Sequence, residues 1–165
     1  YHLYPWGKLP EGFSNQTWEL SRKLSSLANE LLGWIEENLP KDLCANLSMP
    51  LSQMAEGSQE TLLRILHYPP FQGIEDFDEI RAAAHEDINL ITLLPAATAP
   101  GLQVKDNLGN WHDVSCDPGS IVINSGDMLK MLTDGYFRST THRVVNPKAE
   151  LAKKSRFSMP LFFFF

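Results

Sequence analysis

Three side chains in this sequence suit a divalent transition metal. His85 and Asp87 form an H-x-D pair directly ahead of the apolar run Asn89–Leu94, and His142 begins another strand-like run further on. In an extended chain, residues i and i+2 point to the same face, so His85 and Asp87 converge. Two imidazoles and one carboxylate on one face of an octahedron leave positions open for co-substrate and oxygen. The pattern predicts a non-haem iron(II) centre.

A second pair of residues indicates what else this centre binds. Arg156 and Ser158 are again spaced i, i+2, in a run otherwise made of Phe, Met and Leu. A guanidinium fork plus a hydroxyl suits a carboxylate, and an inward arginine is costly without an anionic partner. An isolated H-x-D pair is common at protein surfaces, so this second pair is what favours a metal site with an organic acid beside it.

The bulk composition is that of one ordinary globular domain. The chain has 165 residues, of which 43% are apolar and 21% charged, and its net charge of -6 argues against general nucleic-acid binding. No apolar run is long enough to span a membrane. We expect Cys44 and Cys116 to be reduced thiols in a cytoplasmic protein, because they form no CxxC and no signal peptide opens the chain. The absent initiator Met and the apolar ending at Phe165 predict a truncated catalytic core.

The elements that must position these residues are one long helix and a set of short strands. A helix is predicted over Thr17–Asn38, capped by Ser14 or Asn15, with Pro40 ending it. Its apolar stripe comprises Leu20, Leu24, Leu27, Ala28, Leu31, Trp34 and Ile35. A short helix is expected near Pro50–Ala55. The strand predictions are Thr61–Tyr68, Asn89–Leu94, Leu102–Lys105, Trp111–Val114, Ser120–Asn124, Met128–Leu132, Thr141–Val145 and Arg156–Phe165.

Short strands with turn signals and no intervening helices predict a mainly β fold, a double-stranded β-helix or jelly roll with a packed N-terminal helix. We expect a single domain over 1–165, with a helical scaffold in 1–58 and the jelly-roll core with the iron site in 59–165. Leu102–Val114 is a hairpin candidate, and the acidic segment Gly73–Arg81 is interpreted as a solvated loop.

Several motifs, in this order, make the chain resemble the iron(II)/2-oxoglutarate-dependent dioxygenases of the isopenicillin N synthase-like family. They are Leu63–Pro70, His85-x-Asp87 running into Ile91–Leu94, Gly101–Val104, Trp111, Pro118-Gly119, Ile123–Asp127, Thr141–Pro147 and Arg156–Ser158. The resemblance is close over about residues 60 to 165 and loose over the preceding helix.

The resemblance implies a role for each candidate. His85, Asp87 and His142 would be the catalytic iron ligands, while Arg156 and Ser158 would bind the distal carboxylate of 2-oxoglutarate with help from Tyr68. The cofactors would be Fe(II) and 2-oxoglutarate, with O2 consumed and succinate and CO2 released. The substrate would be an unidentified small molecule that is hydroxylated, desaturated or cyclised.

Two departures from plant members of the family are visible. Leu66 stands where many of them carry Asn, which affects the co-substrate contacts. The stretch from His142 to Arg156 is longer, which suggests a longer turn around Pro147–Lys154.

Two other functions remain open on these residues. In some relatives the enzyme uses no 2-oxoglutarate, and the arginine and serine hold the carboxylate of the substrate itself. A jelly-roll binding module without turnover is the alternative from a different class.

The remaining polar residues are given structural roles. His67 alternates away from Tyr68 and is not expected to be a ligand, and His112 is expected at the surface. Arg64 shares the face of Tyr68, so it could point toward substrate or form a structural ion pair. Asn124 and Asp127 flank a glycine turn, where their side chains are expected to cap backbone groups.

Overall fold

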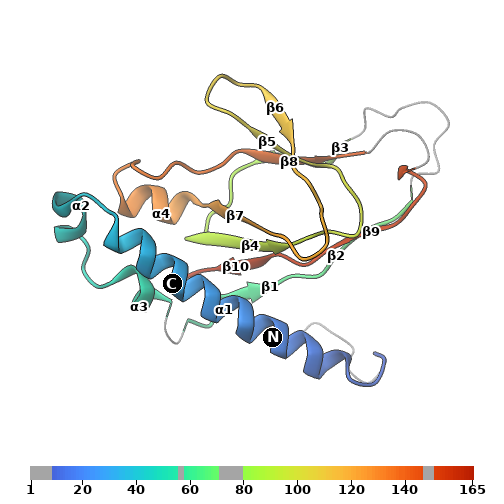
Figure 1. Ribbon diagram of the computed structural model, residues 1–165, viewed down its shortest axis with the longest axis horizontal. Coiled ribbons are helices and arrows are strands. Elements are labelled where there is room, and N and C mark those ends of the chain that lie inside the picture. Colours follow the sequence, from blue (N-terminus) through green and yellow to red (C-terminus); the bar gives the residue numbers. More distant parts are fainter. Residues whose placement is uncertain (1–8, 56–57, 71–79, 147–150) are drawn as a thin grey trace.

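The computed structural model describes residues 9–55, 58–70, 80–146 and 151–165. Its strands form two four-stranded antiparallel sheets, in the orders β1-β10-β4-β7 and β3-β8-β5-β6, and a two-stranded sheet of β2 and β9. Figure 1 shows the β3-β8-β5-β6 sheet facing the sheet that contains β4 and β10, with the long helix on the outer side of the latter. This is the predicted jelly roll with a packed helix. The strands are β1 (Leu62–Leu63), β2 (Leu66–Tyr68), β3 (Ile80–His85), β4 (Ile91–Pro95), β5 (Leu102–Lys105), β6 (Trp111–Asp113), β7 (Ile121–Ser125), β8 (His142–Val145), β9 (Arg156–Ser158) and β10 (Leu161–Phe163).

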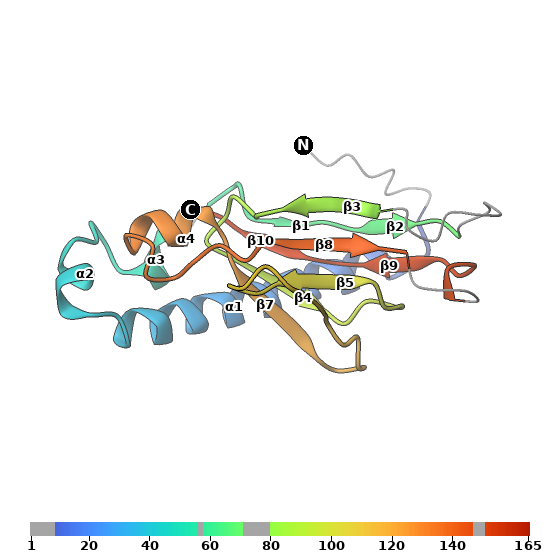
Figure 2. The ribbon, with the colours of Figure 1, turned by 90° about the horizontal axis from the view of Figure 1, so that it is seen from above.

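Helix α1 (Phe13–Glu37) begins earlier than predicted. Its N-cap is Gly12, with a φ of 78°, so the predicted caps Ser14 and Asn15 were wrong and lie inside the helix. Glycine adopts this left-handed conformation without the steric cost that a Cβ would add. Figure 2 shows α1 running alongside the strands.

The core lies between α1 and the sheet it covers. Leu24, Ala28 and Leu32 of the helix are buried in one cluster with apolar residues of β4 and β10. Most of the predicted stripe packs on or in this cluster, but Trp34 is 53% exposed. The helix therefore supports the sheet that contributes Thr92 to the site described below.

Two predicted long strands are each broken into two. Thr61–Tyr68 gives β1 and β2, and the C-terminal run gives β9 and β10, with a bond from the Arg64 amide to the Pro160 carbonyl (2.9 Å) joining the two pairs. The breaks let one continuous ribbon leave the four-stranded sheet and form the separate β2-β9 pair.

Other differences concern weakly patterned segments. Met128–Leu132 was predicted as a strand but lies in helix α4 (Asp127–Leu132), because Leu129 and Leu132 pack against the core at helical spacing. The short helix α3 (Leu51–Met54) was expected, whereas α2 (Lys41–Ala45) was not. Among the described residues, no helix is long and apolar enough to cross a bilayer.

Strand β3 was also missed. Ile80 and Arg81 belong to this strand rather than to the predicted loop, of which residues 73–79 lie outside the described ranges, as do residues 147–150 of the predicted long turn. The strand is alanine-rich and largely exposed, so it has no alternating apolar pattern. The predicted β5-β6 hairpin is present, and Asp106 caps its turn by accepting bonds from the Leu108 and Asn110 amides (2.8 Å each).

Candidate metal centre

Strand pairing places the two candidate histidines side by side. In the antiparallel β3-β8 pair, His85 lies opposite His142, and their ring centroids are 4.4 Å apart. Residues directly opposite each other on antiparallel strands project from the same face of the sheet. Two imidazoles that are distant in sequence thus become neighbours that line one cavity, with His85 partly exposed to solvent.

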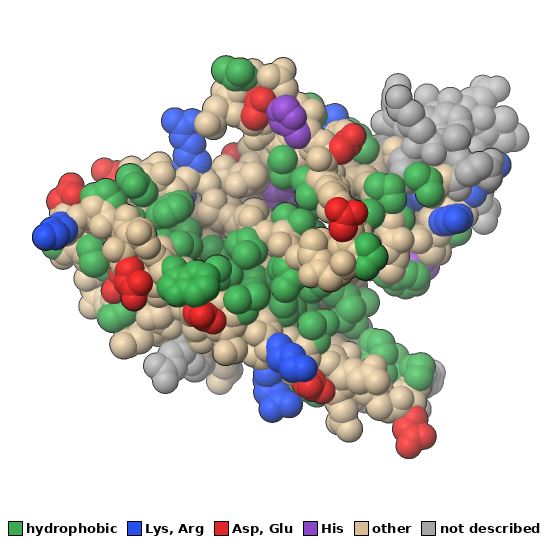
Figure 3. Space-filling view, viewed as in Figure 1, with side chains coloured by type: hydrophobic (Ala, Val, Ile, Leu, Met, Phe, Trp, Pro, Cys, Tyr) green, Lys and Arg blue, Asp and Glu red, His purple; other side chains and the backbone are tan. Residues whose placement is uncertain are grey.

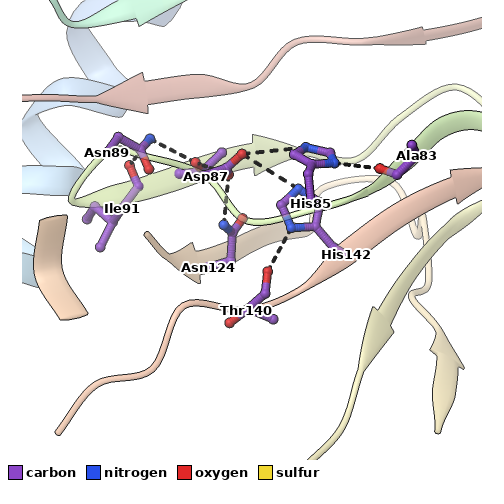
Figure 4. A network of polar contacts seen from close by, with 9 residues as sticks. Ala83, His85, Asp87, Asn89, Ile91, Asn124, Thr140 and His142 are labelled. Carbon is purple, nitrogen blue, oxygen red and sulfur yellow. Dashed lines mark hydrogen bonds and ion pairs between the residues drawn. The ribbon is translucent and has the colours of Figure 1, made fainter. Parts of the chain in front are cut away.

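Asp87 follows the end of β3 and completes the group. Its Oδ1 atom lies 3.7 Å from Nε2 of both His85 and His142, and the three ligand atoms lie within 4.8 Å of one another. Figure 4 shows the carboxylate directed at both rings, and Figure 3 shows histidine at the bottom of a hollow framed by apolar side chains. Two nitrogen donors and one oxygen donor, with no fourth protein ligand among the described residues, fit an iron(II) ion with open coordination positions.

Backbone carbonyls orient both imidazoles. Nδ1 of His85 lies 2.7 Å from the Ala83 carbonyl oxygen, and Nδ1 of His142 lies 2.9 Å from that of Thr140. A carbonyl only accepts, so each Nδ1 carries a proton, and a neutral imidazole then has its lone pair at Nε2, the nitrogen nearer Asp87. This is the tautomer that allows a metal to bind at Nε2.

The second oxygen of Asp87 is held by two side chains that the sequence did not reveal. Oδ2 accepts bonds from the Thr92 hydroxyl (2.6 Å) and the Asn124 amide (2.9 Å), and Asn89 in turn donates to the Thr92 oxygen (2.9 Å). Thr92 and Asn124 lie opposite each other in the β4-β7 pair. The expectation that Asn124 caps a turn was wrong, since its side chain orients the carboxylate.

The start of α4 fixes the backbone of the same loop. The Asp127 amide donates to the Asp87 carbonyl oxygen (2.8 Å), and the Gly126 amide donates to that of Leu90 (3.0 Å). A Cβ on Gly126 would overlap the Asn89 carbonyl oxygen, so only glycine allows this approach. The loop that carries Asp87 is therefore locked between β4 and α4.

One cavity of about 110 Å³ joins the histidine–aspartate group to the predicted carboxylate-binding residues. Antiparallel pairing of β2 with β9 sets Tyr68 opposite Arg156 and Leu66 opposite Ser158, and all four residues line the cavity. The rest of the lining is mostly aliphatic. Leu66, the predicted departure from many plant members, thus places an apolar wall next to Ser158.

Arg156 is a buried charge without an anionic partner among the described residues. It is 2% exposed, its Nε donates to the Ala99 carbonyl oxygen (3.0 Å), and its buried NH1 nitrogen has no hydrogen-bond partner. Its guanidinium carbon lies 5.2 Å from the centre of the Tyr68 ring. Burial lowers the pKa of Arg156, whereas interaction with Tyr68 raises it. A buried guanidinium with a free donor can accept an anion as its partner.

The other candidates lie away from this cavity. His67 stacks on Phe157 with a centroid separation of 4.4 Å and contacts the Ser155 hydroxyl, so it is not a ligand. Arg64 is exposed and does not line the cavity. His112 is exposed and lies 2.7 Å from Asp106 on the β5-β6 hairpin.

Known proteins share this fold and sequence. A crystal structure of a Shewanella oneidensis protein classed as an oxygenase has 54% identity and a TM-score of 0.87, covering 99% of this chain and 61% of that one. A Neurospora crassa structure in complex with alpha-KG, which is 2-oxoglutarate, has 27% identity and a TM-score of 0.74, covering 93% and 46%. A "2-oxoglutarate-Fe(II) type oxidoreductase" from Aspergillus fumigatus is 37% identical over 134 residues, covering 76% of this chain and 38% of that protein.

The chain thus spans between about two fifths and three fifths of the length of these relatives. A family model, the 2OG-Fe(II) oxygenase superfamily, matches residues 59–165, and the cofactors of that family are Fe(II) and 2-oxoglutarate, with O2 as co-substrate. The sequence, the jelly roll and the histidine–aspartate group agree: this chain belongs to the 2OG-Fe(II) oxygenase superfamily.

Proposed function

We propose that this chain is the catalytic core of an Fe(II)- and 2-oxoglutarate-dependent dioxygenase that oxidises a small organic molecule and releases succinate and CO2. The observation that carries the proposal is the unpaired Arg156 guanidinium in the same cavity as His85, Asp87 and His142. A metal triad alone would fit many reactions. A metal triad beside a buried arginine that has no anionic partner among the described residues fits a co-substrate with a carboxylate at its far end.

The three ligands have distinct tasks in this proposal. His85 and His142 offer Nε2 lone pairs, and Asp87 offers Oδ1 while its Oδ2 stays bound to Thr92 and Asn124. The bound Fe(II) supplies the oxidising chemistry with O2 and 2-oxoglutarate. The protein contributes ligand orientation and a mostly apolar cavity that limits access of water.

Arg156, Ser158 and Tyr68 would hold the distal carboxylate of 2-oxoglutarate. Arg156 and Ser158 are both at least 95% buried on the same face of β9, so an arriving carboxylate exchanges its water for fixed donors. An unpaired buried guanidinium is costly, and a carboxylate satisfies its free NH1 group. The primary substrate would bind beside this cavity and could be hydroxylated, desaturated or cyclised.

The test is the stoichiometry of the reaction. Purified protein with Fe(II), 2-oxoglutarate and pooled small-molecule candidates should form one succinate per O2 consumed, and Asp87→Ala should abolish both signals. Oxygen uptake without succinate would instead favour the variant in which Arg156 holds a carboxylate of the substrate. Tight Fe(II) binding with neither signal in any pool would favour a binding module.

A further inference from the structure

Arg156 borders two cavities, and the second contains a cysteine. Besides the cavity of the metal triad, Arg156 lines a second space together with Cys116 and Ala99. The volume of this space, about 10 Å³, is barely enough for one water molecule. The triad does not border this second space. Cys116 therefore lines a space that shares Arg156 with the cavity of the triad.

Cys116 is also reachable from outside. It is half-buried and lines an open surface groove of about 480 Å³ between α1 and the segments 95–97 and 118–121, which includes Leu20 and Pro118. Arg156, by contrast, is 2% exposed. A small solute can thus approach Cys116 from the surface groove, which Arg156 does not line.

Cys116 and Arg156 line the same small space, so a negative charge on the sulfur would act on the guanidinium. Cys116 acts on Arg156 in the direction that raises the pKa of the guanidinium, as Tyr68 does. The thiolate is the form of a cysteine that peroxides oxidise. The NH1 atom of Arg156, which has no hydrogen-bond partner among the described residues, is a donor available to a new anion.

We propose that Cys116 is a site of oxidation by hydrogen peroxide, and that the resulting sulfur oxyanion pairs with Arg156 and weakens 2-oxoglutarate binding. The thiolate sulfur attacks one peroxide oxygen, an S–O bond forms, the O–O bond breaks, and the departing hydroxide takes up a proton to give water. Sulfur loses two electrons and peroxide gains them. A second peroxide yields the sulfinate, a permanent anion at neutral pH.

The competition follows from charge. Arg156 has one positive charge, and in the proposed function it serves the distal carboxylate of 2-oxoglutarate. An oxyanion at Cys116 satisfies the same guanidinium and repels that carboxylate. This inference rests on the proposed function for the role of Arg156, but the oxidation of Cys116 can be measured independently.

The experiment uses protein loaded with Zn(II), which has no redox chemistry with peroxide. The protein is treated with hydrogen peroxide, the oxidant is removed by gel filtration, and 2-oxoglutarate is then titrated by calorimetry. Parent protein should show oxygen added at Cys116 by peptide mass spectrometry and a dissociation constant raised about tenfold. Cys116→Ser should show no rise.

Cys44 supplies the matched control. It is also half-buried and also borders an open groove, but it lies on α2 among Glu36, Glu37 and Lys41. Cys44→Ser should respond to peroxide like the parent protein. A second comparison needs no oxidant and uses Cys116→Asp and Cys116→Asn, whose side chains are similar in size but differ in charge. Only Cys116→Asp should bind 2-oxoglutarate about tenfold more weakly than the parent protein.

Each other outcome is decisive. An unmodified Cys116, an oxidised Cys116 with unchanged affinity, or an equal loss of affinity in Cys116→Ser would overturn the inference. If untreated protein binds Zn(II) but not 2-oxoglutarate, the proposed function fails at Arg156, and that failure is visible before any peroxide is added.

Discussion

At the scale of single residues, Asp87 is the proposed ligand with the most support around it. One oxygen faces the histidines, and the other accepts bonds from Thr92 and Asn124. Without these donors the carboxylate could rotate, and a metal would have to order it on binding. The affinity for metal should therefore depend on residues that never touch the ion.

We predict that Thr92→Val weakens Zn(II) or Fe(II) binding about tenfold to a hundredfold, the usual effect of losing such a support. Valine keeps the branched shape but removes the hydroxyl that donates to Asp87. Thr92→Ser, which retains the hydroxyl, is the control and should stay near the parent value. Calorimetric titration measures both, and equal affinities for the two variants would show that this bond does not position the ligand.

Arg156 allows co-substrate binding to be separated from metal binding. We predict that Arg156→Leu raises the dissociation constant of 2-oxoglutarate by on the order of a hundredfold, because charge-assisted bonds are lost. Arg156→Lys should be intermediate, since an ammonium keeps the charge but lacks the fork. The metal affinity of both variants should stay within about twofold of the parent value, because substitutions at independent sites usually affect each other by no more than this. Unchanged 2-oxoglutarate affinity in Arg156→Leu would contradict the assigned role.

The residue types at the site could be predicted, but their partners could not. His85, Asp87, His142 and Arg156 were identified from spacing and from resemblance. Thr92 and Asn124 were missed because they meet only through the β4-β7 register, and a sequence does not state which residues of two strands lie opposite each other.

At the scale of elements, short apolar runs were the main source of error. Met128–Leu132 fits a strand or a helical turn equally well by composition, and the bonds from α4 to the Asp87 loop decide for the helix. Strand β3 lacks apolar alternation, so its place is determined by pairing with β8 rather than by its own side chains. Both elements matter for the site, because β3 carries His85 and α4 holds the loop of Asp87.

Gly126 tests the contact between α4 and that loop. We predict that Gly126→Ala destabilises the protein by about 1–3 kcal/mol, the usual cost of overpacking, and also weakens metal binding. The cause is steric, because Gly126 has a φ of -110° that any residue can adopt, while an added Cβ would strike the Asn89 backbone.

Gly33 is the matched control in α1. An added Cβ there meets only the Ser52 Cβ at 4.0 Å, so Gly33→Ala should be neutral or stabilise by up to about 1 kcal/mol. Urea denaturation followed by circular dichroism compares the two variants. Equal urea midpoints for the two variants would mean that the contact between α4 and the Asp87 loop accommodates the added Cβ without loss of stability.

At the scale of the whole molecule, the metal centre joins parts of the chain that are far apart in sequence. His85 and Asp87 flank the end of β3, His142 begins β8, and Thr92 and Asn124 support Asp87 from the opposite sheet. The jelly roll could be predicted from the strand pattern and the resemblance. The sheet-to-sheet bond through Asp87 could not, because it depends on how the two sheets face each other.

Metal should therefore stabilise the whole fold rather than a local loop. A ligand at one hundred times its dissociation constant adds about 2.7 kcal/mol if it binds only the folded state, which for a domain of this size is a rise in Tm of roughly 5–10 °C. We predict this rise on adding Zn(II) to the metal-free protein, and a further rise when 2-oxoglutarate is added. His142→Ala should remove both, since it leaves only two protein ligands. A similar rise in Tm in that variant would show that the stabilising ion binds elsewhere. If Zn(II) only slowed amide hydrogen exchange near Asp87 and left Tm unchanged, the site would not couple the two sheets.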